Sequence, residues 1–434
     1  ALKKVVINNK MRGALRTAVA RLSLAAPEAA VRTGAVKSLF DSLSDETVAL
    51  LRERFAEEHN AEVRETLRIA LALADLESQE IDRRLTAIEV LSGKMHPKVR
   101  NRLAELVDSD ASDASGGDPR IREAANKAIA SIDTKRSFYG LIEVAFFGLS
   151  LGSVLVLAAI GLAITFGVMG VINMAHGELI MLGAYATYVV QQAMPGHLEL
   201  SLFAAIPVAF MTSALAGVAI ERGVVRFLYA RPLETLLATF GVSLILQQTV
   251  RTIFSPLNRA VESPSWMSGQ LVINDALAFT NNRLYIIAFS LMVFFMLVAL
   301  LRFTTLGLQI RAVSQNREIA RAMGVRGGWI DAITFGLGAG VAGLAGVALS
   351  QLTNVGPNLG QSHIVDSFMV VVFGGVGNLW GTLVAGLSLG VANKFIEPFA
   401  GAVLAKVLVL IFIILFIQRR PRGLFPQHGR AAEG

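Results

Sequence analysis

The chain has 434 residues, of which 53% are apolar and only 17% are charged, with a formal net charge of +7. An average soluble protein carries about 25% charged residues, so this composition argues against a single soluble globular domain. The chain contains no cysteine, which removes disulfides, thiolate metal sites and thiol nucleophiles from consideration.

Charged residues are concentrated in the first third of the chain. Residues 1–137 hold 23 of the 40 Lys and Arg residues and 21 of the 33 Asp and Glu residues, which leaves 17 and 12 for the remaining 297 residues. The second segment is too apolar to be water-soluble. We therefore predict two domains, a polar one over 1–137 and a membrane-embedded one over 138–434.

The first segment is predicted to be helical throughout, because it is rich in Ala, Leu, Glu and Arg and its apolar residues recur three and four positions apart. An apolar residue followed by Arg opens successive apolar stripes, at residues 31–32, 63–64, 99–100 and 121–122. This pattern is similar to HEAT-like repeats, whose helices stack into a solenoid. The alternative is an ordinary helical bundle. We expect the segment to contact other proteins.

Apolar runs of membrane-spanning length recur through the second segment. They lie at residues 141–166, 172–192, 201–220, 233–253, 284–301, 329–350, 366–377, 379–394 and 402–418. Glycines interrupt some of them, so we expect an all-α polytopic protein with about eight to nine spanning or half-spanning helices. Small residues four positions apart predict close helix packing in lipid, as in Gly148–Gly152, Gly336–Gly340, Gly377–Gly381 and Gly386–Gly390.

Three arginine-rich connections predict the sidedness of the spans: residues 221–231, 302–326 and 418–430. Basic loops favour the cytoplasm, and three spans precede the first such loop, so residues 1–137 are predicted to lie outside the cell membrane. Lys135 and Arg136, next to the first span, argue the other way. The basic charge therefore indicates membrane topology and gives no support to nucleic-acid binding.

A polar cluster interrupts the second apolar run. Asn173, His176 and Glu178 lie within six residues, beside Gly170 and Gly177. Polar side chains are costly at membrane depth, and glycines expose backbone groups that must face protein or water. One interpretation is a broken helix that lines a permeation path, and the other is hydrogen bonding that locks neighbouring helices together. The His-Glu-x-x-His spacing of zinc proteases is absent.

The loop over 302–326 is predicted to form an amphipathic helix that ends at a glycine. Glu318, Ala320 and Gly324 fit the Glu-Ala-Ala-x-x-x-Gly pattern of ABC transporter permeases, with Ile319 in place of the first Ala. Small residues let such a helix enter a groove on an ATPase. A solvated loop that binds nothing is the alternative. The candidate coupling residues are Arg311, Arg317, Glu318, Ala320 and Gly324.

Four strings occur in order, at residues 167–178, 231–247, 311–318 and 374–382, and resemble the branched-chain amino acid type permeases of ABC importers. The resemblance covers residues 140–425. The strings at 377–381, 390–398 and 418–425, together with the helical N-terminal extension, are most similar to the urea branch of this family.

The resemblance implies a subunit of a bacterial inner-membrane importer, with residues 1–137 in the periplasm after an upstream export signal and the C-terminus in the cytoplasm. The implied partners are membrane lipid, a second homologous permease subunit, two cytoplasmic ATPases and a periplasmic solute-binding protein. The chain has no Gly-x-x-x-x-Gly-Lys-Ser/Thr loop, so ATP and Mg²⁺ are expected on the ATPases, with no cofactor, metal or enzyme activity in this chain.

A neutral solute such as urea needs amide-like partners along its path. The candidate path residues are Thr165, Asn173, His176, Glu178, Asn378 and Thr382. Branched-chain amino acids and short amides are the alternative solutes for such an importer. From other classes, the alternatives are a passive urea or amide channel without an ATPase, and a membrane-anchored scaffold in which residues 1–137 carry the function.

Overall fold

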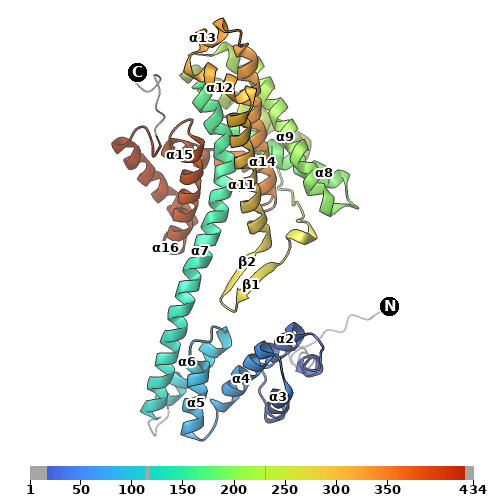
Figure 1. Ribbon diagram of the computed structural model, residues 1–434, viewed down its shortest axis with the longest axis vertical. Helices are drawn as coiled ribbons and strands as arrows, with labels where there is room; N and C mark the ends of the chain where they lie inside the picture. Colours follow the sequence, from blue (N-terminus) through green and yellow to red (C-terminus); the bar gives the residue numbers. More distant parts are fainter. Residues whose placement is uncertain (1–16, 113–117, 230, 426–434) are drawn as a thin grey trace. The chain divides into compact units, whose positions relative to one another are not determined.

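The computed structural model describes residues 17–112, 118–229 and 231–425. Contacts divide the chain into two compact units, one comprising the chain up to Leu141 with Asn274–Leu277, and the other comprising the rest. Helix α7 (Pro119–Met169) begins in the first unit and ends in the second (Figure 1). We describe each unit by itself.

The first unit is built of helices around one apolar core. Its numbered helices before α7 are α2 (Ala29–Leu39), α3 (Asp45–Glu57), α4 (Ala61–Asp75), α5 (Ile81–Leu91) and α6 (Pro97–Ser112). The apolar–Arg pairs are the third and fourth residues of α2, α4, α6 and α7. Val63, Val99 and Ile121 are buried in the core, whereas Val31 is 42% exposed. The shared register supports a repeat, and the HEAT-like classification stays a prediction.

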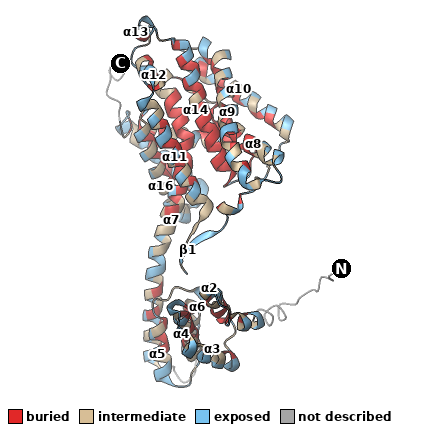
Figure 2. Ribbon diagram, turned by 45° about the vertical axis from the view of Figure 1, so that its right-hand side comes forward, coloured by how far each residue is buried: buried red, intermediate tan, exposed pale blue. Residues whose placement is uncertain are grey.

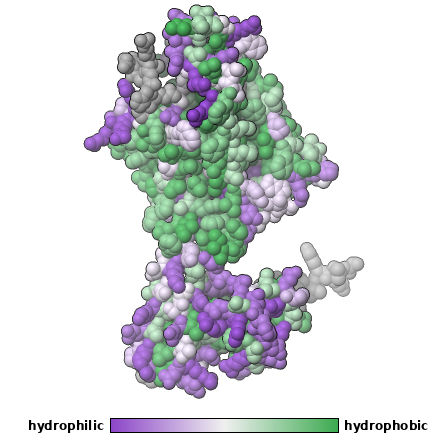
Figure 3. Space-filling view, in the orientation of Figure 1, coloured by the Kyte–Doolittle hydropathy of each residue, from purple (hydrophilic) through white to green (hydrophobic). Residues whose placement is uncertain are grey.

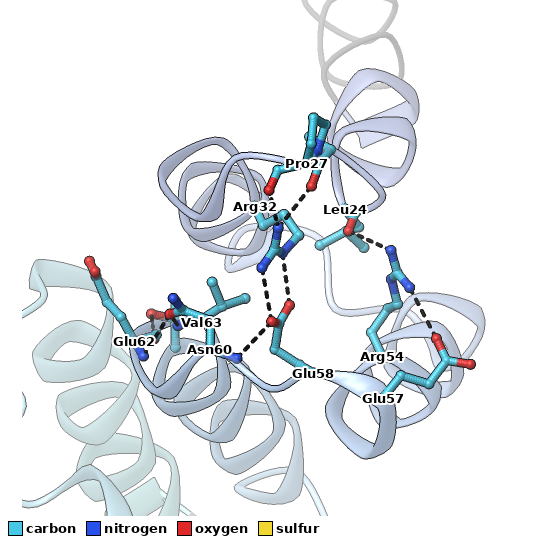
Figure 4. A network of polar contacts seen from close by, with 11 residues as sticks. Leu24, Pro27, Arg32, Arg54, Glu57, Glu58, Asn60, Glu62 and Val63 are labelled. Carbon is cyan, nitrogen blue, oxygen red and sulfur yellow. Dashed lines mark hydrogen bonds and ion pairs between the residues drawn. The ribbon is translucent and has the colours of Figure 1, made fainter.

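Arg32 joins α2 to the end of α3 through a bidentate ion pair (Figure 4). Its Nε and Nη2 donate to Glu58 Oε2 and Oε1 at 2.8 and 2.9 Å, and its Nη1 donates to the carbonyls of Ala26 and Pro27 at 2.9 Å. The hydrogen bonds from Arg32 hold the pKa of Glu58 below its ordinary value. Both side chains are largely buried, so the pair fixes the packing of the first helices.

We expect acid to loosen α2 and α3 by protonating Glu58. Because the pKa of Glu58 is lowered in the folded state, the ion pair stabilises fully above the unfolded pKa and is lost as pH falls through the folded pKa. Glu58→Gln should lower the local opening free energy at neutral pH by about 1–3 kcal/mol. Hydrogen–deuterium exchange of residues 29–57 in the intact protein measures this change. The exposed Glu53→Gln is the control, and equal acid sensitivity of wild type and Glu58→Gln would contradict the assignment.

The second unit consists of helices and most of one hairpin, whose residues Asn274–Leu277 are assigned to the first unit (Figure 1). Its helices after α7 are α8 (His176–Ala193), α9 (Leu198–Gly223), α10 (Pro232–Phe254), α11 (Asn281–Phe303), α12 (Thr305–Gln315), α13 (Arg317–Ala322), α14 (Gly327–Ser350), α15 (Leu359–Gly374) and α16 (Leu379–Arg419). The short helices η1 (Val225–Phe227) and η2 (Ser265–Met267) lie in its connections. Strands β1 (Gln270–Asn274) and β2 (Leu277–Thr280) pair in the long loop, where no strand was expected.

Six helices of the described residues are long and apolar enough to cross a membrane, and a polytopic helical membrane protein is thereby confirmed. They are α7, α9 with the turn after it, α10, α11, α14 and α16. The expected count of eight to nine included α8 and the shorter α15, and it divided α16 in two. Gly401, with φ 78°, does break α16 between the two predicted runs. Figure 3 shows the apolar surface of this unit, which suits lipid contact.

Helix α14 is the central, almost wholly buried helix of the second unit and packs on both α8 and α9 (Figure 2). Glycines make this closeness possible, since a Cβ on Gly183 of α8 would lie 2.1 Å from the carbonyl oxygen of Gly343. The predicted small-residue pairs also lie at contacts. Gly148 and Gly152, for example, meet the backbone of α16. Close packing through glycine is therefore confirmed.

Candidate functional site

The chain leaves helical geometry between α7 and α8, where the sequence predicted a broken helix. Helix α7 ends at Met169, Gly170 has φ 64°, and α8 begins at His176. A residue with a side chain rarely adopts this left-handed conformation, so glycine permits the break. The predicted break is confirmed.

The break buries three polar side chains, Asn173, His176 and Glu178, each at most 1% exposed. Asn173 Oδ1 accepts from the Ala175 amide at 3.0 Å, His176 Nε2 donates to the Ala158 carbonyl of α7 at 2.8 Å, and Glu178 Oε1 accepts from Ser243 Oγ of α10 at 3.0 Å. His176 and Glu178 therefore face different helices. The contact of His176 favours a helix-locking role for that residue.

Each of these side chains keeps a second buried polar atom with no hydrogen-bond partner among the described residues. These atoms are Asn173 Nδ2, His176 Nδ1 and Glu178 Oε2. Buried polar atoms are normally paired, so such atoms indicate a missing partner or a functional role. Within residues 17–112, 118–229 and 231–425, no group of three or more His, Asp or Glu side chains could hold a metal ion.

Glu178 lines a cavity of about 290 Å³ formed by α8, α10 and α15 together with Met174 of the break. Its polar lining comprises Glu178, Ser243 and Gln361, and its apolar lining comprises Met174, Phe240 and Ile364. Gly177 also lines the cavity. Gly177 packs directly on the backbone of Gly360 in α15. The cavity can hold a small organic molecule that has both polar and apolar groups.

The other candidate path residues do not line this cavity. Thr165 Oγ1 donates to carbonyls of its own helix, and Thr382 Oγ1 donates to the Asn378 carbonyl at 3.0 Å. Asn378 caps α16 by accepting from the Gly381 amide at 3.1 Å, and its Nδ2 donates to the Phe425 carbonyl at 3.3 Å. The polar atoms of Thr165, Asn378 and Thr382 thus bond to backbone atoms, and none of these three residues lines the Glu178 cavity.

A polar stripe along α10 was missed by the sequence analysis. Thr235, Thr239, Ser243 and Gln247 are four residues apart, and all are buried. Thr239 Oγ1 accepts from the Met174 amide at 3.1 Å, and Gln247 Nε2 donates to Asn358 Oδ1 at 3.2 Å. Polar residues spaced by four in an apolar run place one polar face on a helix, so the signal was present in the sequence.

The coupling segment forms two helices, not the single helix that we expected. Asn316 adopts extended geometry between α12 and α13, and its Oδ1 accepts from the Ile319 amide at 2.9 Å, which caps α13. The predicted glycine stop is confirmed, because Gly324 has φ 90° and the Val325 amide donates to the Ala320 carbonyl at 3.0 Å. The break arises because Asn caps a helix start better than it continues one.

Arg317 faces inward from α13. Its Nη1 and Nη2 donate to Asp331 Oδ2 and Oδ1 of α14 at 2.7 and 3.0 Å, and its guanidinium lies 5.0 Å from the centre of the Tyr229 ring. The Tyr229 hydroxyl donates to Glu221 Oε1 of α9 at 3.0 Å. Burial raises the pKa of Tyr229, so its phenol stays protonated. This chain of contacts ties α13 to the ends of α9 and α14.

The remaining coupling candidates differ in exposure. Glu318 and Gly324 are exposed, whereas Ala320 is buried. Arg311 donates to the Leu301 carbonyl. Two apolar side chains that the sequence analysis did not select are exposed here: Ile319 of α13 is 62% exposed, and Met323, which caps the end of α13, is 80% exposed. They lie four residues apart, so they share one face of the helix.

Contacts connect the described parts of the three arginine-rich loops. Arg222 lies over the Trp329 ring at 5.0 Å, as Arg317 lies over Tyr229. A hollow of about 250 Å³ is lined by Arg302, Arg311 and Asn378, among others, and Asn378 in turn binds the Phe425 carbonyl. These contacts and this hollow connect the described parts of the loops over 221–231, 302–326 and 418–430. Residues 426–430 lie outside the described residues.

Six helices able to cross a membrane, in the part of the chain that the structure describes, are typical of a multi-pass membrane protein. Residues 144–417 match the family described as the branched-chain amino acid transport system permease component, and the chain belongs to this family. It is therefore a permease subunit of the ABC transporter class in the inner membrane, and not an enzyme.

Curated relatives match about two thirds of the chain. The high-affinity branched-chain amino acid permease LivH of Escherichia coli K12 is 28% identical over 299 residues, which cover 66% of this chain and 96% of that protein. BraD of Pseudomonas aeruginosa is 29% identical over 287 residues, covering 64% and 93%. The ribose import permease RbsC of Escherichia coli K12 is 26% identical over 297 residues, covering 66% and 88%. No solved structure matches the chain.

Proposed function

We propose that this chain is a permease subunit of an ATP-driven importer and that its solute passes the break between α7 and α8. The observation that carries the proposal is the Glu178 cavity, where a membrane helix is interrupted and a buried carboxylate has an oxygen without a partner. Such breaks form solute sites in transporters because unwound backbone and buried polar groups can bind the cargo. A second permease subunit, two ATPases and a periplasmic solute-binding protein complete the importer.

Coupling to ATP hydrolysis runs through α13 in this proposal. Glu318, Ile319 and Met323 form the exposed contact with an ATPase, and Gly324 ends the helix so that it can enter a groove. Arg317 passes the motion of α13 to Asp331 on α14, the helix at the centre of the unit. The arginine-rich loops support a cytoplasmic position for this end, with the first unit in the periplasm.

Two solute classes have specific support. The names of LivH and BraD support branched-chain amino acids, and the apolar wall of Met174, Phe240 and Ile364 suits an aliphatic side chain. Urea is supported by the strings at 377–381, 390–398 and 418–425 and by the N-terminal unit. About a third of this chain lies outside the match to LivH, although that match covers nearly all of LivH. The relatives favour the amino acids.

Uptake into proteoliposomes that contain the assembled importer tests the proposal. We expect ATP-dependent accumulation of labelled leucine or labelled urea that requires the solute-binding protein. Uptake of leucine alone would reject the urea assignment, and uptake of urea alone would reject the amino acid assignment. Equal uptake with and without ATP would indicate the passive channel.

A further inference from the structure

We propose that the Glu178 cavity is a binding station within the path that selects solutes by their N–H donors. This inference rests on the proposed function and adds the chemistry of recognition. The station comprises Glu178 and Ser243 with Gln361 as the polar side, and Met174, Phe240 and Ile364 as the apolar side.

Glu178 supplies an acceptor that the protein leaves open. Ser243 satisfies Oε1 at 3.0 Å, while Oε2 has no hydrogen-bond partner among the described residues, although the side chain is only 1% exposed. Removing a carboxylate oxygen from water without a partner costs free energy. A solute N–H that donates to Oε2 would remove that cost. The unpaired Oε2 acceptor therefore favours solutes with an N–H donor over solutes without one.

Because the cavity lies in a membrane protein, its opening could face either lipid hydrocarbon or an aqueous path. Gln361 and Phe240 are exposed at its edge on α15 and α10. A carboxylate near hydrocarbon is disfavoured, and such residues face the bundle interior or a water-filled path. The opening therefore faces the aqueous path of the assembled importer, where a passing solute can reach Glu178.

The lining defines the class of solute. In its ionised form the Glu178 carboxylate attracts ammonium and amide N–H groups and disfavours anions. The apolar side accommodates an aliphatic group or the face of a planar amide. Urea offers amide N–H donors, and leucine offers an ammonium group and an aliphatic side chain. Both candidate solutes share the N–H chemistry that the station recognises, whereas tetramethylurea keeps the carbonyl and has no N–H.

Cysteine labelling tests the station directly, because the chain contains no cysteine of its own. We expect a small thiol reagent to modify the Ser243→Cys variant in the assembled importer, and the transported solute, urea or leucine, to slow that modification. Tetramethylurea should give no protection. The Thr249→Cys variant, on the exposed side of the same helix, is the matched control and should react equally with and without solute.

Glu178→Gln is the second arm of the test. It should raise the KM of uptake by about 10-fold to 100-fold, because one partner of a charge-assisted hydrogen bond is lost, and it should abolish protection of Ser243→Cys. Tyr185→Phe removes a buried hydroxyl that has no hydrogen-bond partner in the described chain and does not line the cavity, so its uptake should match wild type.

The outcomes separate this inference from the proposed function. Absence of ATP-dependent uptake by the wild-type complex overturns the proposed function. If wild-type uptake is normal, three results would each overturn the station and leave the proposed function standing. They are a Ser243→Cys variant that is unlabelled or unprotected, protection by tetramethylurea equal to that by the transported solute, and wild-type transport by Glu178→Gln.

Discussion

Asp331→Asn is expected to uncouple the importer, leaving ATP hydrolysis largely intact while uptake falls at least about tenfold. In the proposed coupling, the exposed face of α13 would still be available to the ATPase, but the bidentate ion pair that ties α13 to α14 is lost. Asp331 is 1% exposed, and breaking a buried ion pair leaves the remaining charge without compensation. The ratio of solute imported to ATP hydrolysed in proteoliposomes measures the effect.

A double variant distinguishes coupling from simple damage. Arg317→Gln with Asp331→Asn removes both charges, so it should transport better than either single variant, because no uncompensated charge remains buried. Arg326→Gln, an exposed arginine of the same loop, should keep the wild-type ratio. Size-exclusion chromatography shows whether each complex assembles. Two results would reject a coupling role for the Arg317–Asp331 pair. One is a loss of uptake in the double variant equal to the sum of the single losses, and the other is a wild-type ratio of solute imported to ATP hydrolysed in the assembled Asp331→Asn complex.

Gly183→Ala should prevent stable folding of the membrane unit. A Cβ at this position would lie 2.1 Å from the Gly343 carbonyl oxygen and 2.5 Å from its Cα, so the backbones of α8 and α14 would have to separate. Forcing extra volume into such a contact destabilises by about 3 kcal/mol or more. The yield of monodisperse protein and its Tm in detergent measure the loss.

Gly241→Ala is the matched control on α10, because an added Cβ there meets nothing within 4 Å. Alanine favours helix over glycine, so this variant should be as stable as wild type or slightly more stable. Gly343→Ala should behave like Gly183→Ala, since its Cβ would lie 2.5 Å from the Ala209 carbonyl oxygen. Normal yield and Tm for both core variants would show that α8, α9 and α14 do not pack as closely as described.

Several features were determined by the sequence alone because they depend on local composition. The apolar runs predicted membrane helices, since burying backbone polar groups in lipid requires them. Gly170 and Gly324 marked a helix break and a helix end, because both places require left-handed backbone. Contacts connect the described parts of the arginine-rich loops, and the membrane side that these loops predict stays a prediction. The family resemblance was confirmed by the match over 144–417.

Only the tertiary structure decided which polar groups meet. Asn173, His176 and Glu178 are close in sequence, yet His176 binds α7 and Glu178 binds Ser243, which lies 65 residues further along the chain. The sequence predicted Arg317 as a contact residue for the ATPase, whereas the structure shows that it pairs with Asp331 of α14. Sequence patterns report the environment that a side chain needs, whereas its partner depends on how distant helices pack. The solute station and the coupling pair are both products of that packing.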